Sequence, residues 1–166
     1  MSFIFSKRVV TVIALAVLCF AQGRVRAAGQ WAPSSPITAF FIPQSQLIQA
    51  DDLNRILQTS NAEHPLILQV GSRVLFAESH IPGSEYIGPG SQDAGLQQLR
   101  ARVGRLPRKT FIVLYCGCCP WGRCPNVGPA YKVLIDMGFT HVKVLYLADN
   151  FGADWANKGF SVESGR

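Results

Sequence analysis

From residue 47 onward, short apolar runs alternate with amphipathic stretches. Three runs are mostly hydrophobic and are bounded by residues that interrupt regular structure: Leu66–Val70, Phe111–Tyr115 and His141–Leu147. Short runs of this kind predict strands that are buried on both faces, as in a parallel sheet.

Helical patterns separate these strands. Acidic residues at 51 and 52 open one apolar-periodic stretch, residues 94–103 place Leu96, Leu99 and Val103 on one face, and residues 153–157 form a closing helix. A further helix is expected over residues 129–137, started by Asn126 with Pro129 and ended by Gly138. Strands that alternate with helices predict an α/β domain with a central parallel sheet and helices on both faces.

The first 28 residues follow a different pattern. Lys7 and Arg8 precede an apolar run over residues 9–21, and the small residues Ala27 and Ala28 follow. The run is shorter than the roughly 20 residues that span a bilayer, and this order of segments is typical of a secretory signal peptide. We expect cleavage after Ala27 or Ala28 and a periplasmic or secreted protein, with membrane attachment only through an uncleaved leader.

The rest of the chain divides into a lead-in and one domain. Residues 29–46 are rich in proline and serine and are expected to be extended, whereas residues 47–166 contain the predicted strands and helices. A chain of 166 residues suits one ordinary domain plus a short extension.

The composition is that of a globular protein, with 48% hydrophobic and 16% charged residues. The net charge of +6 arises largely in the leader, which has four basic and no acidic residues; the remainder has 12 basic and 10 acidic side chains. So balanced a domain lacks the charge that binds a polyanion, so we expect no nucleic-acid partner.

All four cysteines outside the leader lie in one window, Cys116-Gly117-Cys118-Cys119-Pro120-Trp121-Gly122-Arg123-Cys124. The window joins the carboxyl end of a predicted strand to a helix, where open α/β sheets bind ligands. Backbone N–H groups and the helix dipole at such a place favour anions and lower the pKa of a nearby thiol. The window therefore predicts a reactive thiolate, and a loop stapled by disulfides is the structural alternative.

Several motifs occur in an order that resembles the rhodanese-like (sulfurtransferase) family over roughly Leu47 to Gly165. They are Leu68-Gln69-Val70, the turn His80-Ile81-Pro82-Gly83-Ser84, the strand end Val113-Leu114-Tyr115-Cys116, Gly138-Phe139 before a strand, and Trp155 before Gly159-Phe160. The resemblance implies a sheet of about five parallel strands and transfer of sulfane sulfur through a cysteine persulfide. It also places His80 in a structural turn.

The chain departs from the family at its active loop. Gln69 and Gly71 stand where the family has Asp and Arg, so a buried salt bridge is missing. The family's loop places an Arg five residues after the catalytic Cys; that count leads from Cys116 to Trp121, but from Cys118 to Arg123. We take Cys116 as the nucleophile because the sheet sets its position, with Cys118 as second choice.

The other loop residues are assigned around that nucleophile. Gly117, Trp121, Gly122 and Arg123 are candidates for binding a small sulfur donor such as thiosulfate, with a thiol as acceptor, whereas Cys118, Cys119 and Cys124 are candidate redox or resolving thiols.

No cofactor and no metal are expected. Four-thiolate sites usually take Cys-x-x-Cys pairs from two loops, and adjacent Cys118 and Cys119 cannot both easily face one ion; Cu(I) is kept as a variant. The alternative to a sulfurtransferase is a non-catalytic, redox-sensing or metal-sensing module on the same fold.

Overall fold

The computed structural model describes residues 42–61 and 63–165. The expected signal peptide and almost all of the lead-in lie outside the described residues, so their boundaries stay predictions. No helix in the described part of the chain is long and apolar enough to cross a membrane.

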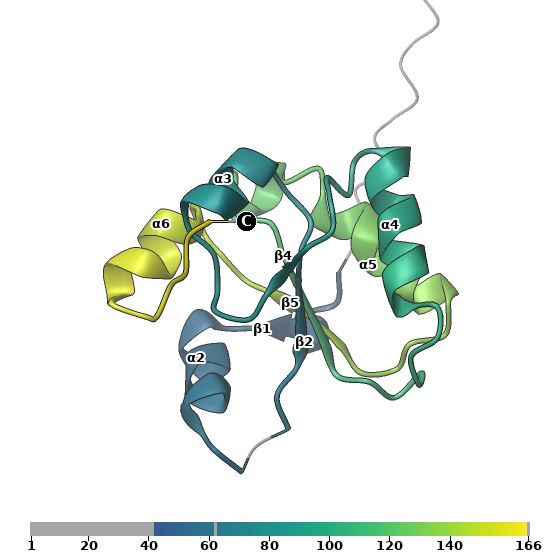
Figure 1. Cartoon of the computed structure of the whole chain (residues 1–166), viewed down its shortest axis with the longest axis horizontal. Coiled ribbons are helices and arrows are strands. Elements are labelled where there is room, and N and C mark those ends of the chain that lie inside the picture. The colour runs from purple at the N-terminus through teal and green to yellow at the C-terminus, as the bar shows by residue number, and fades with distance from the viewer. Residues whose placement is uncertain (1–41, 62, 166) are drawn as a thin grey trace, which may run out of the picture. The chain divides into compact units, whose positions relative to one another are not determined.

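Five strands form one sheet in the order β1-β5-β4-β2-β3, and every neighbouring pair is parallel (Figure 1). They are β1 (Leu47–Ile48), β2 (Leu66–Gln69), β3 (Glu85–Tyr86), β4 (Ile112–Tyr115) and β5 (Val142–Leu145). The strand β4 is therefore central, between β5 and β2. The predicted parallel α/β sheet of about five strands is confirmed.

Helices cover both faces of this sheet (Figure 1). They are α2 (Ala50–Gln58), α3 (Arg73–Glu78), α4 (Asp93–Val103), α5 (Val127–Asp136) and α6 (Phe151–Asp154), with 3-10 turns η1 (Gln44–Gln46), η2 (Trp121–Arg123) and η3 (Ala156–Lys158). Side chains of α4 and α5 pack into the core on one face, whereas those of α2 and α6 pack on the other.

The central strand shows why its sequence is hydrophobic without alternation. Ile112 and Leu114 face the α4–α5 side, and Val113 and Tyr115 face the α2–α6 side, all with 1% exposure or less. Because both faces of β4 are covered, each of its positions must be apolar or have its polar group satisfied.

The sequence pattern missed the shortest elements. The strands β1 and β3 have two residues each and α3 has six, too few to show a period. The helix α5 begins at Val127 rather than at Pro129. Pro129 fits within its first turn, because the N–H groups of that turn have no partner inside the helix and a proline there loses no hydrogen bond.

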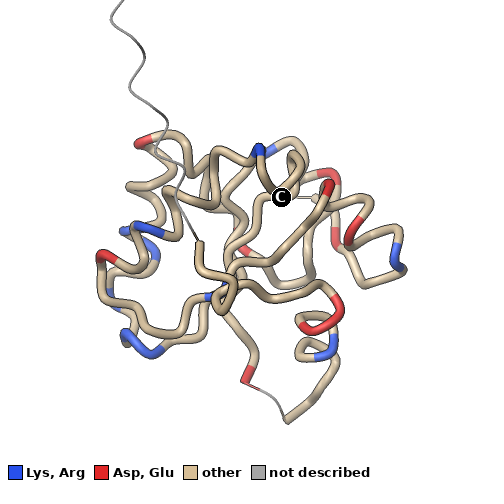
Figure 2. Tube along the Cα trace, turned by 180° about the vertical axis from the view of Figure 1, so that it is seen from behind, with Lys and Arg blue, Asp and Glu red and all other residues tan. Residues whose placement is uncertain are grey.

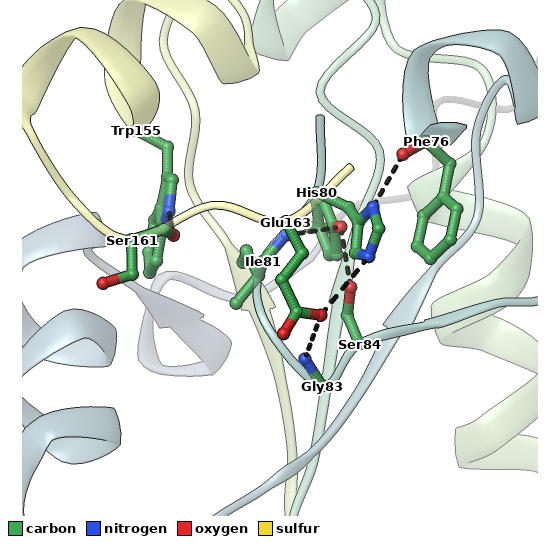
Figure 3. A network of polar contacts seen from close by, with 9 residues as sticks. Phe76, His80, Ile81, Gly83, Ser84, Trp155, Ser161 and Glu163 are labelled. Atoms are coloured by element: carbon green, nitrogen blue, oxygen red, sulfur yellow. Dashed lines mark hydrogen bonds and ion pairs between the residues drawn. The ribbon is translucent and has the colours of Figure 1, made fainter. Parts of the chain in front are cut away.

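A polar network joins the His80 turn to the C-terminal segment (Figure 3). The His80 ring donates from Nδ1 to the Phe76 carbonyl oxygen at 2.7 Å, and the backbones of His80 and Glu163 exchange hydrogen bonds of 2.8 and 2.9 Å. The Trp155 indole donates to the Ser161 carbonyl oxygen at 3.0 Å. These contacts give His80 the structural place that the resemblance implied.

Charged residues of both signs occur on each side of the domain (Figure 2). The described pairs of lysine or arginine with a carboxylate are surface contacts, such as that of Arg102 with Glu85 at 2.6 Å. This distribution agrees with the nearly balanced charge of the sequence outside the leader.

Candidate functional site

Cys116 lies at the carboxyl edge of the sheet, directly after the central strand β4. Hydrogen bonds hold the chain on both sides of this point: the Val70 N–H donates to the Tyr115 carbonyl oxygen at 2.8 Å, and the Gln69 side chain donates to the Cys116 carbonyl oxygen at 3.1 Å. Cys116 is 4% exposed, so its sulfur is fixed by the sheet and not by a mobile loop.

Gln69 and Gly71, the two residues at β2 that differ from the family motif, both lie beside Cys116. The oxygen of the Gln69 side chain accepts from the Gly71 N–H at 3.0 Å, so the amide links two backbone segments without charge. A Cβ atom at Gly71 would lie 2.7 Å from the Cys116 Sγ. Glycine at this position therefore makes room for the buried sulfur.

The loop then folds back over the segment that follows β5. Gly117 has φ of 75°, and a Cβ atom there would lie 2.6 Å from the Phe151 Cβ. The Phe151 N–H donates to the Gly117 carbonyl oxygen at 3.1 Å, and the Trp121 N–H donates to the Ala148 carbonyl oxygen at 3.1 Å. Gly117 thus meets both conditions that require glycine, a positive φ and a close approach.

The loop brings its sulfur atoms together. The Sγ atoms of Cys116 and Cys118 are 3.0 Å apart, and those of Cys118 and Cys119 are 3.1 Å apart. The sulfurs of Cys116, Cys118 and Cys124 all lie within 4.8 Å of one another. These four cysteines are free thiols in the described structure, so the disulfide-stapled alternative finds no support here.

Asn126 contacts this group, a role that the sequence analysis did not give it. Its side-chain oxygen accepts from the Ser91 N–H at 3.0 Å, and its NH₂ group points to the sulfurs of Cys116 at 3.3 Å and Cys118 at 3.8 Å. Asn126 precedes α5, as expected, but its side chain makes no capping hydrogen bond. The signal that could have identified it is an amide two residues after the last loop cysteine.

Protonation differs sharply among these thiols. The pKa of Cys124 is lowered to about 6, mainly because the Cys116 thiol donates to its sulfur and also because the N–H groups of Asn126 and Val127 do so. The pKa of Cys116 is raised, since it holds its proton toward Cys124 and is buried. The start of the helix therefore stabilises a thiolate, as expected, but at Cys124 and not at Cys116.

Cys119 behaves unlike Cys124. Burial of its thiol and hydrogen bonding with Cys118 raise its pKa to about 12. Its sulfur also faces the Arg123 carbonyl oxygen at 3.8 Å. Cys119, like Cys116, therefore holds its proton at neutral pH.

Two cavities border the loop. The larger has a volume of about 450 Å³, and its lining includes Cys116, Gly117 and Cys118, with Glu78 as the one charged side chain among the described residues around it. The smaller is lined in part by Cys116, Cys119, Trp121 and Cys124. Gly122 and Arg123 are exposed on η2 and border neither of these cavities.

Comparison with known proteins places this geometry in a family. Residues 49–148 match the rhodanese-like domain family, whereas a comparison with curated protein sequences finds no match. Among solved structures, BH2092 protein from Bacillus halodurans is 22% identical with a TM-score of 0.56, over 72% of this chain and 77% of that chain. The rhodanese-like domain of Alr3790 protein from Anabaena sp. is 22% identical with a TM-score of 0.52, over 72% and 79%.

A thiosulfate sulfurtransferase from Pseudomonas aeruginosa is also similar, at 22% identity and a TM-score of 0.50, over 72% of this chain but 20% of that one. At these identities the structures show a shared fold. Together with the family match over residues 49–148, they establish that the chain belongs to the rhodanese-like domain family.

Proposed function

We propose that the protein is a sulfurtransferase that carries sulfane sulfur as a persulfide on Cys116. One observation carries the proposal: the sulfur of Cys116 is held at the end of the central strand and lies against a cavity of about 450 Å³. The Cys118 N–H and the Asn126 amide both point at this sulfur. Such donors stabilise the negative charge that appears when a thiol attacks or a persulfide forms.

In the first half-reaction, Cys116 passes its proton to the Cys124 thiolate and attacks the outer sulfur of a donor R–S–SH. The new bond joins this sulfur to the Cys116 Sγ, while the donor's S–S bond breaks and its electron pair leaves on R–S⁻. The proton on Cys124 then neutralises R–S⁻. The products are R–SH and a Cys116 persulfide, with Cys124 again a thiolate.

In the second half-reaction, an acceptor thiolate R′–S⁻ attacks the outer sulfur of the Cys116 persulfide. The product R′–S–SH leaves, and the electron pair of the broken S–S bond returns to Cys116 as a thiolate. This thiolate takes up the proton that the acceptor thiol released, which restores the Cys116 thiol. No net oxidation takes place over the cycle, so neither half-reaction needs an external oxidant or reductant.

The cavity lining favours one kind of donor. Glu78 contributes a carboxylate, while Arg123 is exposed on η2 and does not border this cavity. A doubly charged anion such as thiosulfate would meet like charge there without a compensating cation. We therefore favour a small organic persulfide with a neutral or cationic body, and we expect thiosulfate to be the poorer donor.

We also propose that the protein acts outside the cytoplasm after removal of its leader. The support is the order of basic, apolar and small residues over positions 1–28. Mass spectrometry of the protein from its native host would then show a chain that begins at Ala28 or Gly29. A chain that begins at Met1 and is found in the cytosol would contradict this proposal.

The experiment that tests the function is mass spectrometry of the intact protein after exposure to a donor. The persulfide of cysteamine, a small donor with a cationic body, should add one sulfur to the wild type and to Cys119→Ser, but none to Cys116→Ser. Thiosulfate should add sulfur more slowly at equal concentration. Sulfur on Cys116→Ser but not on Cys118→Ser would make Cys118 the carrier, and the absence of added sulfur with either donor would overturn the proposal.

A further inference from the structure

Three of the four loop sulfurs form a compact group that sulfur transfer does not fully use. The Sγ atoms of Cys116, Cys118 and Cys124 lie within 4.8 Å of one another, whereas Cys119 is outside the group. The sequence argued against a metal because adjacent Cys118 and Cys119 would have to face one ion. The fold meets that objection with another set of three: Cys118 lies 3.0 Å from Cys116 and groups with it and Cys124, whereas the Cys119 sulfur, although 3.1 Å from that of Cys118, lies outside the set of three.

The spacing of the group suits a metal ion bound by three thiolates. With metal–sulfur bonds of about 2.3 Å, three sulfurs in a plane around an ion lie about 4 Å apart. The three sulfurs lie within 4.8 Å of one another, and the separation between Cys116 and Cys118 is 3.0 Å. Cys118 is half-buried on the loop, so it is the ligand that is free to open this separation.

The chemistry of the donors selects the metal. All three are sulfur atoms, and no His, Asp or Glu in the described part of the chain joins the group. Thiolates are soft ligands that prefer Cu(I) or Zn(II), and structural zinc almost always takes four protein ligands. A set of three sulfurs without a fourth protein ligand therefore points to Cu(I).

The surroundings complete the site. The Asn126 side chain donates to the sulfurs of Cys116 and Cys118, and the N–H groups at the start of α5 face Cys124. Outer-shell donors of this kind orient thiolate ligands and offset their charge. The cavity of about 450 Å³ reaches Cys116 and Cys118 and provides an entry path.

We propose that Cys116, Cys118 and Cys124 form a three-coordinate Cu(I) site. This function goes beyond sulfur transfer. Because Cys116 belongs to both sites, a bound Cu(I) ion and a persulfide on Cys116 exclude one another, and Cu(I) blocks sulfur loading.

The test is a titration of the full-length, reduced protein with Cu(I) under anaerobic conditions, in competition with a chromogenic Cu(I) chelator. The wild type should take up one equivalent, and X-ray absorption should show sulfur scatterers only. Single Ser variants of Cys116, Cys118 and Cys124 should each lose about 100-fold in affinity, and Asn126→Ala about 10-fold. Cys119→Ser is the matched control and should bind as the wild type does.

Circular dichroism of each variant separates lost ligands from lost folding, and half-buried Cys118 provides a ligand variant that spares the core. The absence of stoichiometric Cu(I) uptake, an equal loss in Cys119→Ser, or displacement of Cu(I) by equimolar Zn(II) would overturn the site. No sulfur donor is present in this titration. A protein that binds Cu(I) but never accepts sulfur would therefore refute the proposed transfer alone, and the reverse result would refute the copper site alone.

Discussion

The turn around His80 and the loop after β4 both place polar groups in the core, but they do so in opposite ways. In the turn, each buried group meets a fixed backbone or side-chain partner: the His80 ring bonds to the Phe76 carbonyl, and the Ile81 N–H donates to the Tyr115 hydroxyl at 3.3 Å. In the loop, the sulfurs of Cys116 and Cys118 are one another's partners at 3.0 Å. Each of these hydrogen bonds of the turn therefore has one fixed donor and one fixed acceptor, whereas the thiol protons of the loop can pass from one sulfur to another.

This difference separates a structural region from a reactive one. No buried side-chain nitrogen or oxygen among the described residues lacks a hydrogen-bond partner. The hydrogen bond that Cys116 donates to Cys124, together with burial, raises the pKa of Cys116, whereas that hydrogen bond and the backbone N–H groups of Asn126 and Val127 lower the pKa of Cys124. The two regions should therefore respond differently to mutation: the turn through stability, and the loop through rate.

The largest expected effect is on the chemistry of the loop, from Gly71→Ala in the segment between β2 and α3. The new Cβ would lie 2.7 Å from the Cys116 Sγ, so the sulfur must shift. A displacement of about 1 Å at a reacting atom costs roughly 100-fold in rate. We expect that loss in the rate of sulfur loading, measured by single-turnover mass spectrometry.

The matched control for that substitution is Gly122→Ala on the cysteine loop itself, because a Cβ atom at Gly122 meets no atom within 4 Å. It should keep the wild-type rate. Equal losses in the two variants would mean that the loop responds to any added methyl group, and that Gly71 has no special place beside the sulfur.

The next effect belongs to the turn, from His80→Ala. The ring is stacked on Phe76 at 3.9 Å between centroids and is 5% exposed as a residue. Loss of its packing and of its hydrogen bond should cost about 2–3 kcal/mol in the free energy of unfolding, measured in urea. The rate of sulfur loading under native conditions should stay within about twofold; a loss comparable to that of Gly71→Ala would place His80 in the reaction.

These residues also show which parts of the fold and of the site the sequence could predict. The three long strands, α4 and the place of Cys116 followed from hydrophobic runs, because a fully covered sheet leaves a strong pattern. The pairing of Cys124 with Cys116 and the contact of Asn126 with two sulfurs could not follow, because they depend on how a long loop folds back onto residues 148 and 151. The four clustered cysteines predicted a site with thiol chemistry, but not which three sulfur atoms would lie together.

A smaller effect is expected from pH, in the metal-free protein with a chelator present. With a pKa of about 6, Cys124 is a thiolate at pH 7 and becomes protonated as the pH falls below 6. A protonated Cys124 cannot accept the Cys116 proton, so sulfur loading should fall about tenfold between pH 7 and pH 5. The fall should persist in Cys119→Ser, whose thiol has a pKa of about 12, and disappear in Cys124→Ser; its persistence in Cys124→Ser would contradict this assignment.

The smallest effect is expected at the rim of the turn, from Glu163→Gln. The Glu163 carboxylate is 3.7 Å from the His80 Nε2 and 3.4 Å from the Gly83 N–H, and its side chain is 58% exposed. Because the carboxylate is exposed to solvent, its pairing with the buried ring contributes only about 0–1 kcal/mol, and the amide of glutamine keeps an oxygen for Gly83. The backbone bridge between His80 and residue 163 remains as well, since it does not depend on the side chain. Urea unfolding should therefore show a change below about 1 kcal/mol, and a loss as large as that of His80→Ala would mean that the carboxylate, and not the ring and the backbone bridge, holds the C-terminal segment on the turn.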